Sequence, residues 1–110
     1  MRVVQVKTPG GLDHLTLAEQ EVGEPGPGEI RVRWHASSLN YHDLLVANGG
    51  LPVSDGRIPM SDGAGEIVAI GAGVTRWQTG DKVMSLFFPD WQEGRHRSER
   101  TRAITGDSIE

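Results

Sequence analysis

Two short segments carry the polar side chains best suited to chemistry. Residues 40–43 read Asn-Tyr-His-Asp, and residues 61–63 read Ser-Asp-Gly. An amide N–H can donate a hydrogen bond to an oxygen on which negative charge develops, as in a reaction at a carbonyl group. A structural interpretation is also open, because Asn40 is a good helix N-cap, Asp43 falls in the first turn, and Asp62 precedes a glycine as turn residues do.

The sequence does not support a metal or nucleotide site. It contains no cysteine, so a zinc ion would depend on His, Asp and Glu side chains alone. Residues 63–68 and 71–76 each begin G-x-G but lack the third glycine, and neither follows a strand and opens a helix as a phosphate-binding loop does. No short metal-ligand spacing occurs among the four histidines, which are His14, His35, His42 and His96.

Composition limits the class of protein. With 110 residues and 36% hydrophobic side chains, the chain can build one modest core, and its 15 Gly and 6 Pro predict frequent turns. No apolar stretch is long enough to span a membrane, and no secretory signal is visible. The net charge of −4 argues against nucleic-acid binding, since the only basic cluster, residues 95–102, has no interleaved aromatic residue. The absence of thiols favours a cytoplasmic location.

Short strands must position the polar residues. In residues 30–37 the alternation places Ile30, Val32 and Trp34 on a buried face and His35 on a polar face. The unbroken apolar run at 67–70 predicts burial on both faces of its strand. A mainly β fold, a small and partly open barrel, follows from the five predicted strands at 3–6, 15–18, 30–37, 63–71 and 83–88.

One short helix is predicted after the third strand. Asn40 caps its start, Tyr41, Leu44 and Leu45 share one face, and the glycines at 49–50 end it. About eight residues cannot hold a helix in water without packing. We expect a compact domain over residues 1–94 and a polar tail over residues 95–110, which has few apolar residues to anchor it and therefore frays.

Several segments, in this order, resemble the N-terminal GroES-like domain of the medium-chain dehydrogenase/reductase superfamily, which includes alcohol dehydrogenases and quinone oxidoreductases. The resemblance covers about residues 1–90. It is carried by Pro-Gly-Pro-Gly-Glu at 25–29, Ser-Leu-Asn-Tyr-His-Asp at 38–43, Asp-Gly-Ala-Gly-Glu-Ile-Val at 62–68, Gly-Ala-Gly-Val at 71–74 and Gly-Asp-Lys-Val at 80–83.

The departures from that family are informative. Zinc-dependent members place a cysteine where Asn40 stands and a His-Glu pair where Ser61 and Asp62 stand, and they carry a four-cysteine lobe after the position of Leu86. The resemblance therefore implies the zinc-independent branch, which transfers a hydride from NAD(P)H to a quinone, enone or other carbonyl compound.

The resemblance also implies roles for individual residues. Asn40 would lie in the cleft near the nicotinamide and donate its amide N–H, Tyr41 would contact the cofactor, and Asp43 would support the site as a catalytic-centre residue. The family binds its cofactor on a Rossmann domain, which these 110 residues do not contain. We therefore expect that the chain alone neither binds NAD(P)H usefully nor catalyses a reaction.

Two alternatives remain open. One is a free-standing GroES-like module that self-associates or binds a partner through unpaired strand edges. The other is a zinc-type alcohol dehydrogenase with an unusual first domain, which the missing ligands disfavour.

Overall fold

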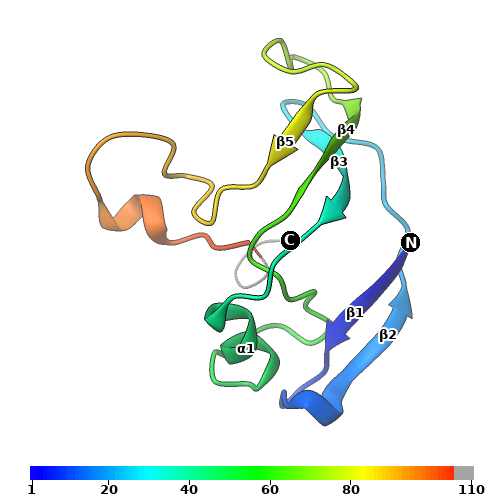
Figure 1. Cartoon of the computed structure of the whole chain (residues 1–110), viewed down its shortest axis with the longest axis vertical. Coiled ribbons are helices and arrows are strands. Elements are labelled where there is room, and N and C mark those ends of the chain that lie inside the picture. The colour runs from blue at the N-terminus through cyan, green and yellow to red at the C-terminus, as the bar shows by residue number, and fades with distance from the viewer. Residues whose placement is uncertain (106–110) are drawn as a thin grey trace.

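Five strands form two antiparallel sheets in the computed structural model, which describes residues 1–105. The smaller sheet is a hairpin, and the larger has the strand order β3-β4-β5 (Figure 1). The sheets do not close into a barrel, so the predicted mainly β class with partly open architecture is confirmed. The strands are β1 (Arg2–Val6), β2 (Leu15–Glu19), β3 (Ile30–Ala36), β4 (Ala64–Ile70) and β5 (Lys82–Met84).

The predicted helix is α1 (Tyr41–Ala47), which follows its N-cap Asn40. It ends where Gly49 adopts a φ of 76°, a left-handed conformation that glycine adopts without steric cost. Two single-turn 3₁₀ helices, η1 (Leu12–His14) and η2 (Ser98–Thr101), complete the regular structure of the described residues. No helix within residues 1–105 is long and apolar enough to cross a membrane.

The buried face of α1 differs from the prediction. Asp43, Val46 and Ala47 are buried, whereas Tyr41 is 74% exposed and Leu44 is also exposed. Hydrophobicity alone predicts that Tyr41 and Leu44 face the core. The carboxylate of Asp43 faces inward instead, because it accepts hydrogen bonds from two backbone N–H groups. With Asp43 facing the core, Tyr41 faces solvent.

The three-stranded sheet is less covered than the sequence predicts. Ile67 of β4 is fully buried, but Ile70 is 42% exposed and Trp34 of β3 is 51% exposed. His35 is exposed, as predicted. Register shifts on either side of the Val32–Trp34 segment interrupt the simple alternation of faces. A hollow of about 500 Å³ lies beside the strand residues Val32 and Trp34, and its lining also includes Trp77 and Met84.

Strand β5 is shorter than predicted, because it ends at Met84 and does not continue to residue 88. Beyond Met84, Ser85 closes the pairing with Gly63: its N–H donates to the Gly63 carbonyl at 2.9 Å, and its hydroxyl accepts from the Gly63 N–H at 2.9 Å. The following phenylalanines leave the sheet and join a row of aromatic rings with centroid separations of 4.7–6.3 Å, made by His42, Phe87, Phe88, Trp91 and His96.

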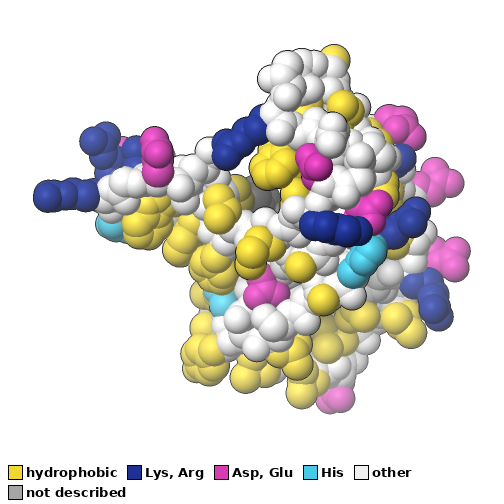
Figure 2. Space-filling view, turned by 45° about the horizontal axis from the view of Figure 1, so that its top comes forward, with side chains coloured by type: hydrophobic (Ala, Val, Ile, Leu, Met, Phe, Trp, Pro, Cys, Tyr) yellow, Lys and Arg dark blue, Asp and Glu magenta, His cyan; other side chains and the backbone are white. Residues whose placement is uncertain are grey.

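Most of these aromatic residues lie between β5 and η2, in a part of the chain that projects from the rest of the molecule (Figure 1). We call residues 85–101 the projecting segment. Arginine side chains gather at its tip (Figure 2), and Arg100 folds back to donate to the backbone carbonyl of Glu93. The predicted tail therefore contains one turn of 3₁₀ helix up to Thr101. Residues 106–110, where fraying was also expected, lie outside the described part, and the domain boundary at residue 94 stays a prediction.

The hairpin docks on the end of α1 through its backbone. The N–H of Gly11 donates to the carbonyl of Ala47 at 2.7 Å. Gly10 and Gly49 lie so close that a Cβ added to Gly10 would come within 2.6 Å of the Gly49 Cα. The contact thus requires two residues without side chains.

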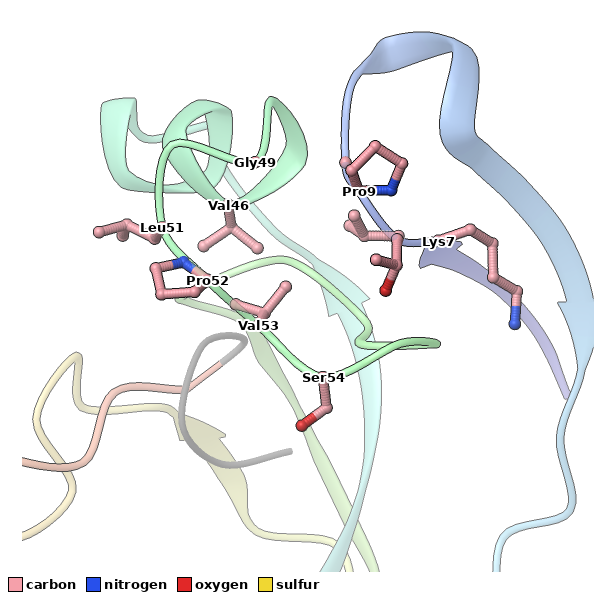
Figure 3. Close-up of a pocket in the computed structure, with 11 residues that line it drawn as sticks. Lys7, Pro9, Val46, Gly49, Leu51, Pro52, Val53 and Ser54 are labelled. Carbon is pink, nitrogen blue, oxygen red and sulfur yellow. The ribbon is translucent and has the colours of Figure 1, made fainter.

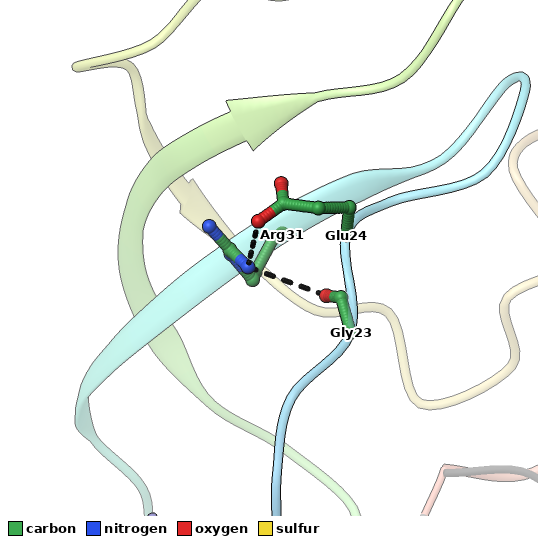
Figure 4. Close-up of polar contacts among 3 residues, drawn as sticks. All are labelled: Gly23, Glu24 and Arg31. Carbon is green, nitrogen blue, oxygen red and sulfur yellow. Dashed lines mark hydrogen bonds and ion pairs between the residues drawn. The ribbon is translucent and has the colours of Figure 1, made fainter.

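The Pro-Gly loop before β3 is held by polar contacts. The Arg31 guanidinium contacts a carboxylate oxygen of Glu24 at 3.2 Å and the carbonyl of Gly23 at 3.3 Å (Figure 4). After β4, Gly71 comes against the same loop, and its N–H donates to the Glu29 carbonyl at 2.8 Å. These contacts hold the start of β3 and the end of β4 together.

Candidate functional site

The two polar segments found in the sequence meet where α1 begins. The Asp62 carboxylate, just before β4, accepts hydrogen bonds from the segment that connects β3 to α1. Its Oδ1 accepts from the Ser38 backbone N–H at 3.0 Å and from the Ser37 hydroxyl at 3.3 Å. Its Oδ2 accepts from the Ser38 hydroxyl at 2.7 Å and from the Asn40 amide nitrogen at 3.0 Å. We call Ser37, Ser38, Asn40, Ser61 and Asp62 the polar cluster.

These donors stabilise the ionised form of Asp62. The hydrogen bonds from the Asn40 amide and from the backbone and hydroxyl of Ser38 lower the pKa of Asp62 from 3.8 to about 2. All of these donors are uncharged groups, so hydrogen bonding and not a neighbouring cation causes the shift. At neutral pH the cluster therefore carries one negative charge.

The contacts fix the orientation of the Asn40 amide. A carboxylate can only accept, so the group that faces Asp62 must be the nitrogen and not the oxygen. The same nitrogen lies 3.2 Å from the Ser61 hydroxyl and 3.5 Å from the Ser38 carbonyl. Both amide hydrogens thus have acceptors within the protein, one of them close and charged and the other more distant.

Asp43 supports the cluster from inside the fold. Its side chain is only 4% exposed. Its Oδ2 accepts the backbone N–H of Asn40 at 2.9 Å, and its Oδ1 accepts the backbone N–H of Ser61 at 2.8 Å. Asp43 therefore ties the start of α1 to the segment before β4. This geometry assigns it a positioning contact, while its predicted catalytic contribution stays a prediction.

Large apolar side chains stand exposed beside the polar cluster. Leu39 and Tyr41 flank Asn40 in the sequence and are both strongly exposed. His42, one residue further, is partly buried, with its ring edge-on to Phe87 at a centroid separation of 5.2 Å. The arrangement places exposed apolar side chains beside a polar cluster that is tied to the buried Asp43 and Ser61.

The donor set does not fit zinc. Within residues 1–105 no three His, Cys, Asp or Glu side chains converge on one point. The positions that would supply zinc ligands in the zinc-dependent dehydrogenases that the sequence resembles hold an amide, a hydroxyl and one carboxylate, and that carboxylate already accepts hydrogen bonds from Ser38 and Asn40. Zinc in proteins is bound mainly by thiolate, imidazole and carboxylate groups, and the amide and hydroxyl at these positions are not among them.

The structure brings Asn40, Asp43 and Asp62 together, and Tyr41 follows Asn40 with its side chain exposed. The roles of Asn40, Tyr41 and Asp43 stay predictions. The serine donors Ser37 and Ser38 were not predicted. Their place between a strand and a helix N-cap was the available signal, because short hydroxyl side chains there often bond to nearby groups.

A second hollow lies at the other end of α1. It encloses about 240 Å³ between the β1–η1 connection and the loop that follows α1 (Figure 3). Buried Val46 contributes to its lining, together with Pro9, Leu51, Pro52 and Val53. The Thr8 N–H donates to the Asp55 carboxylate at 2.8 Å and so joins the two segments that line this hollow. A seven-residue helix is about 10 Å long, which separates this hollow from the polar cluster.

The comparisons with known proteins agree with the fold. Residues 26–106 match the alcohol dehydrogenase GroES-like domain, and the chain belongs to that family. It is an N-terminal domain of the medium-chain dehydrogenase/reductase superfamily, of the kind found in alcohol dehydrogenases and quinone oxidoreductases. The predicted resemblance is confirmed.

Three similar proteins illustrate the range of relatives. A mycocerosic acid synthase-like polyketide synthase of Mycolicibacterium smegmatis is 47% identical over 76% of this chain and 4% of its own length. A zinc-type alcohol dehydrogenase-like protein of Schizosaccharomyces pombe is 37% identical over 87% of this chain and 29% of its own. The structure of Escherichia coli quinone oxidoreductase complexed with NADPH has a TM-score of 0.70 and 25% identity, covering 76% of this chain and 26% of that one. The chain thus spans less than a third of each.

Proposed function

We propose that this chain forms the N-terminal domain segment of a zinc-independent, NAD(P)H-dependent oxidoreductase that reduces a quinone, enone or other carbonyl compound. The polar cluster is the observation that carries the proposal. At the positions where the zinc-dependent members carry their ligands, the Asn40 amide nitrogen lies 3.2 Å from the Ser61 hydroxyl and donates to the Asp62 carboxylate at 3.0 Å. A carbonyl oxygen would then be polarised by hydrogen-bond donors in place of a Lewis acid. A cytoplasmic location belongs to the same proposal and rests on the cysteine-free sequence.

In this proposal Asn40, Tyr41 and Asp43 have different roles. Bound NAD(P)H would supply the hydride. The Asn40 amide donates a hydrogen bond to the substrate oxygen as negative charge develops there, using the hydrogen whose present acceptors lie at 3.2 and 3.5 Å. Tyr41, exposed beside it, provides an aromatic surface for the nicotinamide ring. Asp43 keeps the start of α1 in place.

The test is substitution of Asn40 in an NAD(P)H-dependent protein that carries this segment. We expect Asn40→Ala to lower kcat/KM for a quinone by about tenfold to a thousandfold, the range seen when one donor to a developing oxyanion is removed. A change of less than about twofold would show that Asn40 does not stabilise the transition state. Asp90→Ala, an exposed carboxylate in the projecting segment, is the control and should leave kcat/KM unchanged.

The nucleotide would be bound by another domain. All strand pairings among residues 1–105 are antiparallel, and none belongs to a parallel nucleotide-binding sheet. We therefore propose that the 110-residue chain alone neither binds NADPH tightly nor turns over substrate. Calorimetric titration with NADPH up to about 1 mM should give no heat of binding, and binding in the micromolar range would contradict this.

A second candidate function is a free-standing module that associates through its three-stranded sheet. The exposed Trp34 and the apolar hollow beside it favour this candidate, as do the outer positions of β3 and β5 in the sheet. Size-exclusion chromatography of the purified chain separates the two proposals. Concentration-dependent dimers that Trp34→Ser abolishes would support the module, and a monomer at all concentrations would exclude it.

A further inference from the structure

We propose that Asp62 is a positioning residue, whose carboxylate holds the Asn40 amide with its N–H groups, and not its carbonyl oxygen, directed into the polar cluster. The importance of this orientation for catalysis rests on the proposed function, in which Asn40 donates to the substrate. The orientation itself can be tested without any turnover.

The contacts require a carboxylate at this position. Both oxygens of Asp62 face donors: Oδ1 faces the Ser38 N–H and the Ser37 hydroxyl, and Oδ2 faces the Ser38 hydroxyl and the Asn40 amide nitrogen. An amide in place of the carboxylate would turn its own NH₂ group toward one of these pairs. At the Oδ2 position, that NH₂ group would meet the NH₂ group of Asn40. A side chain with two acceptor oxygens satisfies the Ser38 N–H, the Ser38 hydroxyl and the Asn40 amide, whereas the single hydrogen of the Ser37 hydroxyl also has the Asp62 backbone carbonyl at 2.8 Å.

The two amide hydrogens of Asn40 have acceptors at different distances, and this difference leaves one hydrogen for a substrate oxygen. One hydrogen is held by a charged acceptor at 3.0 Å, whereas the acceptors for the other lie at 3.2 and 3.5 Å. The second hydrogen can therefore be shared with an incoming oxygen while the first keeps the amide plane fixed. The Asn40 side chain also takes part in the capping box of α1 through the backbone N–H of Asp43. Asp62 adds the charged acceptor on the nitrogen side, and its removal weakens the preference for the orientation in which the N–H groups face the cluster.

The experiment is nuclear magnetic resonance of the ¹⁵N-labelled 110-residue chain, observing the side-chain NH₂ group of Asn40. We expect two well-separated proton signals, with nuclear Overhauser contacts to Ser61. In Asp62→Asn we expect those contacts to be lost and the two signals to move together, while Asp62→Glu restores part of the separation. Asp55→Asn is the matched control, because Asp55 also accepts a backbone N–H at 2.8 Å but lies outside the cluster.

Unchanged Asn40 signals in a folded Asp62→Asn variant would overturn the proposal. If that variant does not fold, acid titration of the natural chain decides the question. The Asn40 protons and the Asp62 carboxyl carbon should then titrate with one midpoint, and separate midpoints would overturn the proposal. A complete protein without reductase activity would refute the proposed function but not this inference. If it is active, Asp62→Asn should lower kcat more than it raises KM.

Discussion

The buried carboxylate of Asp43 accepts the backbone N–H of Ser61 at 2.8 Å across a sequence separation of 18 residues. Its other oxygen accepts the N–H of Asn40 at the start of its own helix. One side chain thus links the segment before α1 to the segment before β4, and both arms of the polar cluster depend on it.

Removing this link should destabilise the whole chain. We expect Asp43→Ala to lower the free energy of unfolding by about 2–4 kcal/mol, because the N–H groups of Ser61 and of the N-cap residue Asn40 both lose their acceptor. Urea unfolding followed by circular dichroism measures the change. Asp90→Ala, at an exposed position, should change the free energy by less than about 0.5 kcal/mol. A similar loss in both variants would contradict the proposed role of Asp43.

The two isoleucines of β4 provide a matched pair for testing the core. Ile67 is fully buried and Ile70 is 42% exposed, so the same truncation has different consequences. Ile67→Ala should cost about 2–5 kcal/mol of unfolding free energy. Ile70→Ala should cost less than about 1 kcal/mol. Thermal melting of both variants decides the point, and equal costs would mean that the core does not centre on Ile67.

Gly71 should not tolerate a side chain. A Cβ added there would come 1.8 Å from the Gly26 carbonyl oxygen, whereas a Cβ at Gly23 would meet no atom within 4 Å. We expect Gly71→Ala to cost about 1–3 kcal/mol, because the Pro-Gly loop must move away from β4. Gly23→Ala should be nearly neutral. Comparable urea midpoints for the two variants would contradict the close approach of the loop.

The depressed pKa of Asp62 predicts a loss of stability in acid. Its folded value of about 2 lies below the unfolded 3.8, so the contribution is fully present above pH 4 and is lost as the pH falls toward 2. The pKa values of Asp55 and Glu66 are lowered too, so a difference measurement is needed. The gap in unfolding free energy between the natural chain and Asp62→Asn should shrink between pH 5 and pH 2, whereas a constant gap would contradict this assignment.

Local signals in the sequence predicted the elements well. Asn40 and the glycines at 49–50 bounded α1 because caps depend on one or two residues, and turn residues separated all five strands. Burial was predicted less well. Trp34 alternates with charged residues and so suggests an inner face, but exposure depends on what covers the sheet, which no local pattern contains.

In the candidate site too, local sequence signals predict the elements but not the contacts between them. The proximity of Asn40 and Asp62 is not predicted by any local spacing, since 22 residues separate them. The inward turn of Asp43 could not be predicted from helical periodicity, which treats a carboxylate as a surface group. Its partner N–H belongs to another segment, so only the folded chain shows why burying it is favourable.

The contact between Gly10 and Gly49 sets how near the hairpin can come to α1. Main-chain atoms alone meet there, so this contact is independent of the exposed side chains of β1 and β2, although the buried Val3 and Val6 of β1 belong to the core. Exposed positions such as Leu17 of β2 are therefore suitable for attaching a dye or an affinity tag without shifting the helix that follows Asn40.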